Sequence, residues 1–162
     1  MDAAVRTVMG LTARQTGGPY PPPVTGSPLP YTRPAMANRA FDWLAQAERD
    51  LQHAENSRRA GEHEWACFAS HQAAEKAVKA LHLHLGQEAW GHLIARLIRE
   101  LPIAVPEELV QKGMVLDTFY VPARYPNSHP EGAPFEHYGP LQSEEGIGHA
   151  REIVAFVRSQ MA

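Results

Sequence analysis

Apolar residues begin to recur at helical spacing after position 37, and the first such run predicts a helix over 38–60. Its apolar face advances in steps of four and three residues and consists of Ala40, Leu44, Ala47, Leu51 and Ala54. Such steps return to one side of an α-helix, because a turn takes about 3.6 residues. Asn38 can cap the first turn, and Gly61 can adopt the left-handed conformation that ends a helix.

A second, longer run predicts a helix over 62–85 that ends before Gly86. It carries two apolar stripes, one with Ala66, Ala69, Ala73, Ala77 and Ala80 and the other with Ala74, Val78, Leu81 and Leu85. Two adjoining stripes give a wide apolar face, which is typical of a helix surrounded by others. We expect this helix at the centre of a bundle, where its alanines allow a neighbour to approach closely.

Two more helices are predicted before residue 122. A short one over 92–100 ends at Pro102, and the next begins with Pro106 near its first position and ends at Pro122. The core face of the latter is expected to hold Leu109, Gly113, Leu116 and Tyr120.

Residues 122–142 contain five prolines and predict a long loop, after which Ser143 is expected to cap the last helix. The apolar stripe of that helix contains Ile147, Ala150, Val154, Val157 and Met161. No run of alternating β-branched residues predicts a strand. The expected fold class is all-α, an antiparallel four-helix bundle with a short extra helix.

Proline content changes the picture at the N-terminus, because half of the 14 prolines lie in the first 35 residues. Proline fixes the backbone and removes a donor, while the glycines between these prolines loosen the chain. We predict that 1–35 is a disordered, flexible extension and that 36–162 is the helical domain. The extension lacks the continuous apolar stretch of a signal peptide.

Charge and cysteine content exclude several classes of protein. A net charge of −3 argues against nonspecific polyanion binding. The one cysteine, Cys67, excludes a disulfide framework and a cysteine-based zinc site, and we expect it in the core. No apolar run approaches the roughly 18 residues of a membrane span. A cytoplasmic location is expected. The nine histidines lack metal-ligand spacing, and no metal or cofactor is expected. Core or interface positions are expected for Trp43, Trp65 and Trp90.

The predicted loop holds the first candidate site, because Arg124 and His129 lie there with four residues between them. Arginine can hold a phosphate through two hydrogen bonds, and histidine can move a proton near neutral pH. Together they could cleave RNA without a metal, with His129 transferring protons and Arg124 stabilising the phosphorane. The alternative is that Arg124 pairs with a helix end and His129 is a solvated loop residue. The spacing alone favours this alternative.

A polar face of the second predicted helix is the other candidate site. It carries His71, Glu75, Lys79 and His82 in one row, with Gln72 and Lys76 beside them. These side chains can line a cleft that receives a nucleotide or a partner. The alternative is a solvated face on which Glu75 and Lys79 form an ion pair worth about tenths of a kcal/mol, and without other information this alternative is favoured.

Four segments together resemble the HEPN family, which consists of small all-α domains of prokaryotes. They read WLAQAERDL at 43–51, FASHQAAEKAVKAL at 68–81, GH at 91–92 and LDTFYVPARYP at 116–126. The His-Gln-Ala-Ala-Glu-Lys and Arg-Tyr-Pro pieces are the most specific. The resemblance covers about residues 38–160 and leaves 1–35 outside the family domain.

The resemblance implies a homodimeric helical bundle that acts with a minimal nucleotidyltransferase, as in toxin–antitoxin or nucleotide-handling pairs. Many family members are metal-independent ribonucleases with an Arg-x(4–6)-His motif, which Arg124 and His129 match. The motif departs from those members at Tyr125, where a polar residue usually follows the arginine. The Arg-Tyr-Pro form resembles a branch regarded as nucleotide-binding. Glu131 stands where some toxins carry a tyrosine that their partner modifies, so that modification is not supported.

Three hypotheses follow for the function. The first is a nucleotide-binding and partner module whose ligand meets His71, Gln72, Glu75, Lys76, Lys79, Arg124 and Tyr125. The second is an endoribonuclease toxin with Arg124 and His129 as catalytic residues. The third is a structural dimeric subunit without a ligand. We favour the first by a small margin, because of the Arg-Tyr-Pro form and because residues 36–162 carry 12 basic and 17 acidic residues, a net charge of −5.

Overall fold

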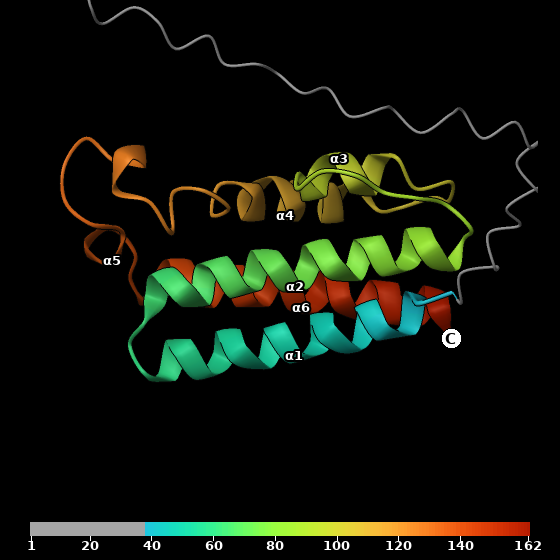
Figure 1. Cartoon of the computed structure of the whole chain (residues 1–162), viewed down its shortest axis with the longest axis horizontal. Coiled ribbons are helices and arrows are strands. Elements are labelled where there is room, and N and C mark those ends of the chain that lie inside the picture. The colour runs from blue at the N-terminus through green and yellow to red at the C-terminus, as the bar shows by residue number, and fades with distance from the viewer. Residues whose placement is uncertain (1–37) are drawn as a thin grey trace, which may run out of the picture. The chain divides into compact units, whose positions relative to one another are not determined.

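The computed structural model describes residues 38–162, and this part of the chain contains helices and no strands (Figure 1). The elements are α1 Ala40–Arg59, α2 His63–His84, α3 Ile94–Arg99, α4 Glu107–Asp117, a 3₁₀ turn at Pro126–Ser128, α5 Pro134–His137 and α6 Pro140–Met161. The predicted all-α bundle with a short extra helix is confirmed. The predicted extension over 1–35 lies outside the described residues.

The predicted glycines end the first two helices, whereas the N-cap of α1 is Arg39 and not the predicted Asn38. The Asn38 carboxamide oxygen accepts a hydrogen bond of 3.0 Å from the Ala40 amide at the start of α1. Gly61 has a φ of +80° in the turn between α1 and α2, and Gly86 has a φ of +76° after α2. These left-handed conformations favour glycine and allow the chain to turn sharply.

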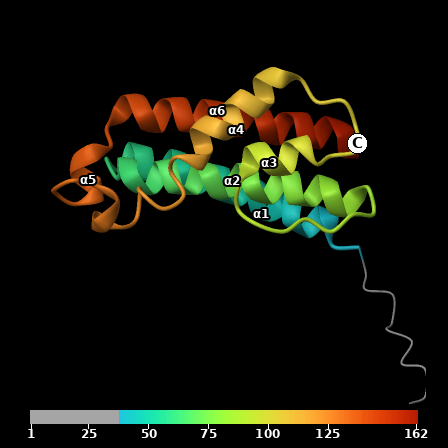
Figure 2. The ribbon, with the colours of Figure 1, turned by 90° about the horizontal axis from the view of Figure 1, so that it is seen from above.

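Helix α2 lies at the centre of the bundle, as its two apolar stripes predict. It contacts α1 and α6 on one side and α3 and α4 on the other. Figures 1 and 2 show α1, α2 and α6 as three long neighbouring helices, with α3 and α4 placed over α2. The connection between α2 and α3 contains His92, which contacts Glu75 and Tyr120 in the candidate site described below.

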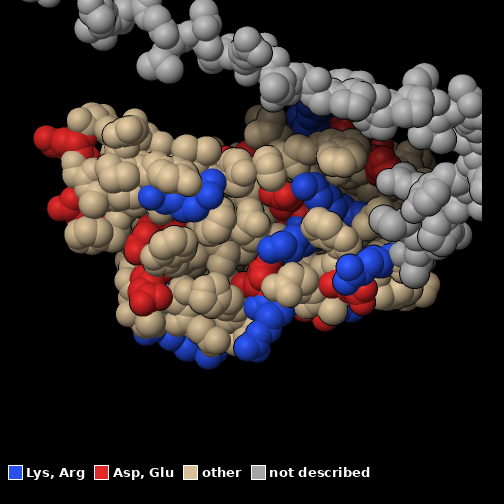
Figure 3. All heavy atoms as spheres, viewed as in Figure 1, with Lys and Arg blue, Asp and Glu red and all other residues tan. Residues whose placement is uncertain are grey.

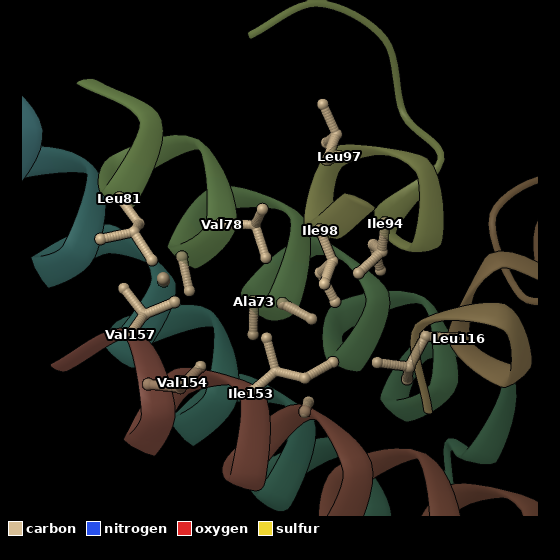
Figure 4. Close-up of a cluster of buried hydrophobic side chains, with 14 of the residues drawn as sticks. Ala73, Val78, Leu81, Ile94, Leu97, Ile98, Leu116, Ile153, Val154 and Val157 are labelled. Carbon is tan, nitrogen blue, oxygen red and sulfur yellow. The ribbon is translucent and has the colours of Figure 1, made fainter. Parts of the chain in front are cut away.

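Leucine, isoleucine and valine side chains fill the space between α2, α3, α4 and α6 (Figure 4). Leu81 and Val78 on α2 face Val157 and Ile153 on α6, and Leu116 on α4 closes one end. Cys67 is also fully buried, as expected, and burial raises the pKa of its thiol to about 12. The thiol is therefore a neutral core group rather than a nucleophile.

Several predicted boundaries are wrong. The last helix begins at Pro140 rather than after Ser143, because proline suits the first helical position. Ser143 lies buried in its first turn, where its hydroxyl donates to the Pro140 carbonyl at 3.1 Å. Helix α4 ends at Asp117, well before Pro122, because the following amides turn back to carbonyls three residues earlier.

Pro106 lies near the first position of α4, as predicted, because it directly precedes Glu107. The region after α4 differs from the prediction. The region predicted as one loop contains the 3₁₀ turn at Pro126–Ser128 and the short helix α5, because its prolines lie at the first or second position of these turns.

A glycine allows α3 and α4 to approach each other. A Cβ at Gly113 would lie 3.0 Å from the Ala95 amide nitrogen and 3.1 Å from Ile94 Cγ2. We expect Gly113→Val to lower the free energy of unfolding, measured in urea, by about 1–3 kcal/mol, because the helices must separate. Gly148→Val is the matched control, since a Cβ at Gly148 meets nothing within 4 Å. An equal effect of both substitutions would contradict the close helix approach.

Candidate functional site

Arg124 lies after α4 with its guanidinium held among aromatic rings. Its Nε donates a 2.8 Å hydrogen bond to the Tyr120 carbonyl, which fixes the plane of the group. The carbon at its centre lies 4.4 Å from the ring centroid of Phe68, 4.7 Å from that of Tyr120 and 5.1 Å from that of Tyr125. Within 38–162 no protein group accepts a hydrogen bond from its Nη atoms. The two Nη groups are therefore available to an anion.

His71 on α2 forms the buried support of this arginine. Its side chain has no exposed surface, and its Nε2 lies 2.9 Å from the His92 carbonyl oxygen. Its ring stacks on Tyr120 with centroids 4.9 Å apart. Burial lowers the pKa of His71 to about 4, although the nearby Glu75 carboxylate partly opposes this effect. His71 is therefore neutral at pH 7.

Glu75 lies one turn further along α2 and is buried, while its partner His92 is half exposed. It accepts a 2.7 Å hydrogen bond from Lys79 and lies 3.2 Å from Nδ1 of His92. A buried carboxylate needs such partners, because leaving it without them would be costly. His92 also stacks on Tyr120, with centroids 4.7 Å apart, and thus links Glu75 to the residue that holds Arg124.

Asp117 completes this polar cluster from the end of α4. Its carboxylate accepts hydrogen bonds from the Ile94 and Ala95 amides, at 2.6 Å and 3.2 Å, and so ties α4 to the first turn of α3. Burial raises the pKa of Asp117, while these two amides act in the opposite direction. Its Oδ1 lies 3.8 Å from Nε2 of His71, so α2, α3 and α4 meet at this cluster.

A groove of about 240 Å³ opens beside this cluster, between α1 and α2. Ala69 lies in it, and its other lining side chains are Asp50 and His53 from α1 and Trp65, Phe68, Gln72 and Lys76 from α2. Lys76 is bonded to the Asp50 carboxylate, so this charge pair neutralises itself. Phe68 is shared with Arg124, because the guanidinium lies over the Phe68 ring. The groove and the guanidinium thus share the Phe68 side chain, although Arg124 itself does not line the groove.

The tryptophans do not lie in the core. Trp65 is 47% exposed and borders the groove, and Trp43 is 37% exposed in a second hollow of about 350 Å³ that also meets Lys76. Trp90 is more exposed still. The expectation that these tryptophans lie in the core is therefore wrong for all three. The expectation that they lie at an interface stays a prediction.

The residues predicted for nucleotide binding fall into two groups. Gln72 and Lys76 line the groove, while Arg124 and the exposed Tyr125 lie next to it. The buried group consists of His71, Glu75 and the largely buried Lys79, which lie behind the arginine. His82 lies apart, because its buried ring bonds to the Leu97 carbonyl at 2.9 Å. The cluster also includes His92, Asp117 and Tyr120, although no spacing in the sequence connects these three residues to α2.

His129 lies in a different environment from Arg124. Its Nε2 is 2.8 Å from the Pro122 carbonyl oxygen, and its ring stacks on His137 at a centroid distance of 4.0 Å. No hydrogen bond or ring contact in the described part of the chain joins His129 to Arg124. A catalytic role for this pair stays a prediction.

The remaining surface gives little sign of other ligands. Figure 3 shows Lys and Arg interspersed with Asp and Glu on the face formed by α1 and α2, without a continuous patch of one sign. Between residues 38 and 162 no three His, Cys, Asp or Glu side chains gather in a way that could hold a metal ion. None of the helices described has both the length and the hydropathy of a membrane span.

Comparison with solved structures shows that this bundle belongs to a known class of helical domain. The structure of TT1696 from Thermus thermophilus is 50% identical, with a TM-score of 0.75, over 76% of this chain and 98% of that one. ST0689, described as an archaeal HEPN homologue, is 41% identical with a TM-score of 0.67 over 76% and 98% of the two chains.

The third structure is an HEPN domain protein, tm0613, from Thermotoga maritima. It is 33% identical, with a TM-score of 0.60, over 73% of this chain and 95% of that one. The HEPN domain itself matches residues 40–160, so the chain belongs to the HEPN domain family. No curated protein matches the chain.

Proposed function

We propose that this HEPN domain is a cytoplasmic nucleotide-binding and partner module that acts with a minimal nucleotidyltransferase in a toxin–antitoxin-like pair. The observation that supports this proposal is the geometry of Arg124. Its guanidinium is oriented by the Tyr120 carbonyl, lies against three aromatic rings and, within 38–162, keeps its Nη atoms free of protein acceptors. A planar, oriented guanidinium can bind phosphate oxygens through two parallel hydrogen bonds.

The groove supplies what a nucleotide needs beyond its phosphates. Phe68 and Trp65 offer apolar ring surface, and Gln72 offers hydrogen bonds, within a volume of about 240 Å³. Aromatic surface next to a cation is how proteins commonly hold a base and its phosphate together. The buried His71 and Glu75 and the partly buried Asp117 support this site by fixing Tyr120 and thereby Arg124.

Besides nucleotide binding, the proposal includes two associations of this chain, a homodimer and a complex with a nucleotidyltransferase. The family supports both, and so do the exposed aromatic side chains Trp43 and Trp65 on the α1–α2 face, since such side chains are enriched at interfaces. Light scattering after size exclusion should give twice the chain mass. A nucleotidyltransferase from a neighbouring gene should co-purify with the chain. A monomer that retains no such partner would contradict this half.

The nucleotide-binding half is tested by replacing Arg124. We expect Arg124→Gln to weaken the binding of nucleoside triphosphates by about tenfold or more, because two charge-assisted hydrogen bonds to phosphate are lost. Isothermal titration calorimetry measures the affinity. Arg96→Gln is the matched control, since Arg96 is exposed on α3 and pairs only with Glu100 among the residues described. Its affinity should equal that of the wild type.

The same proteins distinguish the ribonuclease hypothesis. Wild type, Arg124→Gln and His129→Ala are incubated with total RNA in EDTA and scored for cleavage and for growth arrest on expression. Cleavage that both substitutions abolish would replace the binding module by an endoribonuclease. Absence of any nucleotide binding at millimolar ligand would overturn the proposed function.

A further inference from the structure

His92 lies in the connection between α2 and α3, and three contacts fix its position. Its carbonyl oxygen is 2.9 Å from Nε2 of His71, and its ring stacks on Tyr120 with centroids 4.7 Å apart. Its Nδ1 lies 3.2 Å from each oxygen of the Glu75 carboxylate. The side chain is nevertheless 54% exposed. A histidine that is both accessible and held by its backbone, its ring face and one nitrogen is well placed to bind a ligand.

The Glu75 carboxylate determines which nitrogen of the His92 ring stays available. A carboxylate can only accept a hydrogen bond, so Nδ1 carries a proton and donates it to Glu75. Nε2 lies on the other side of the ring, and no group between residues 38 and 162 forms a hydrogen bond with it. This nitrogen is an acceptor while the ring is neutral and becomes a donor when the ring takes up a second proton.

Arg124 lies against the same aromatic ring as His92. The carbon at the centre of its guanidinium and the centroid of the His92 ring are each 4.7 Å from the ring centroid of Tyr120. The two groups are therefore separated by no more than twice this distance. The phosphoryl groups of a nucleoside triphosphate follow one another in a chain, and such a chain can contact both the guanidinium and Nε2.

We propose that His92 is a second phosphate-binding residue beside Arg124 and that the nucleotide binds together with a proton. This inference rests on the nucleotide-binding function proposed above and goes beyond it. Phosphate oxygens are acceptors, so the lone pair on Nε2 of a neutral His92 repels them, whereas the N–H of a protonated ring donates to them. The Glu75 carboxylate stabilises the charged ring from the other side, since an opposite charge nearby favours protonation.

The groups around His92 leave this residue as the one that takes up the proton between pH 6 and pH 8. The titratable and charged side chains that face it are His71, Glu75 and Lys79 from α2, Asp117 from α4, and Tyr120 and Arg124 after α4. His71 stays neutral over this range, because burial lowers its pKa to about 4. Carboxyl groups ordinarily titrate below this range, and lysine, tyrosine and arginine titrate above it.

Isothermal titration with ATP at pH 8, 7 and 6 tests the proposal by comparing the wild type with His92→Phe. Phenylalanine keeps a ring on Tyr120 but cannot take up a proton. The phosphates of ATP titrate alike with both proteins, so the ratio of the two affinities isolates the effect of His92. We expect the two proteins to bind about equally at pH 8 and the wild type to bind about tenfold more tightly at pH 6.

A second variant and a second ligand sharpen this test. His92→Gln can form hydrogen bonds but does not titrate, so it should lose the same pH dependence as His92→Phe. Inorganic triphosphate has neither base nor sugar and should show the same difference between the proteins as ATP. His84→Gln is the matched control, because His84 is exposed at the end of α2 and its ring contacts Phe41, away from the site. It should keep the wild-type pH dependence.

The outcomes separate this inference from the proposed function. An affinity ratio of wild type to His92→Phe that is the same at all three pH values would overturn the role of His92 and leave nucleotide binding intact. A pH effect seen with ATP but not with inorganic triphosphate would place His92 away from the phosphates and overturn the inference too. If the wild type binds neither ligand at any pH, the proposed function and this inference fail together.

Discussion

Replacing Leu81 by alanine is expected to lower the free energy of unfolding by about 2–5 kcal/mol. The Leu81 side chain is fully buried on the central helix and faces Val157 on α6 (Figure 4). The substitution removes the branched end of the side chain and leaves a cavity. The neighbouring long helices could fill this cavity only by approaching each other, which the rest of the packed core resists. Since domains of this size are stable by about 5–15 kcal/mol, the loss is a large fraction of the total.

Urea denaturation followed by circular dichroism measures this loss. Leu141→Ala is the matched control, because the same substitution is made at an exposed position in the first turn of α6. We expect the control to change stability by about 0.5 kcal/mol or less. Similar values for Leu81→Ala and Leu141→Ala would show that α2 does not lie at the centre of the core.

The positions of the long helices could be predicted because their apolar residues recur at helical spacing. Two apolar stripes on α2 predicted its central place, and Gly61 and Gly86 predicted where helices end. The predicted helix boundaries are wrong where tertiary contacts determine the end of a helix. Asp117 ends α4 beside the amides of α3, and no local pattern in the sequence shows that contact. At the start of α6, the sequence alone does not distinguish Pro140 as the first helical residue from Pro140 as the last loop residue, and Ser143 is the stronger local signal for a helix cap.

The candidate site could be predicted only in part for the same reason. Residues on one helix, such as Gln72 and Lys76, follow from helical spacing and do share the groove. His92 and Tyr120 come from separate segments, and their stacked rings are a tertiary contact that spacing cannot reveal. The different hydrogen-bond partners of Arg124 and His129 are of this kind too, because four intervening residues do not determine side-chain contacts in a chain that turns between helices.

Acidification is expected to destabilise the domain through His71. Its folded-state pKa is about 4, below its ordinary value of 6.5, because the ring is buried beside Tyr120 and has no room for solvent. Between these two pH values the unfolded chain binds a proton that the folded chain does not, so stability falls as the pH falls. The Glu75 carboxylate and the His92 carbonyl favour the charged ring, and the charges of His92 and Arg124 oppose it, but burial is the largest effect.

The loss from His71 should be about 2 kcal/mol between pH 7 and pH 5 and approach about 3 kcal/mol near pH 4, since one pKa unit corresponds to about 1.4 kcal/mol. Urea denaturation at pH 7, 6 and 5 measures it against His71→Gln, which cannot titrate and should lose correspondingly less stability over this range. His53→Gln removes an exposed histidine from α1 and should retain the wild-type pH dependence. If His71→Gln and His53→Gln show the same pH dependence, His71 is not held neutral by burial.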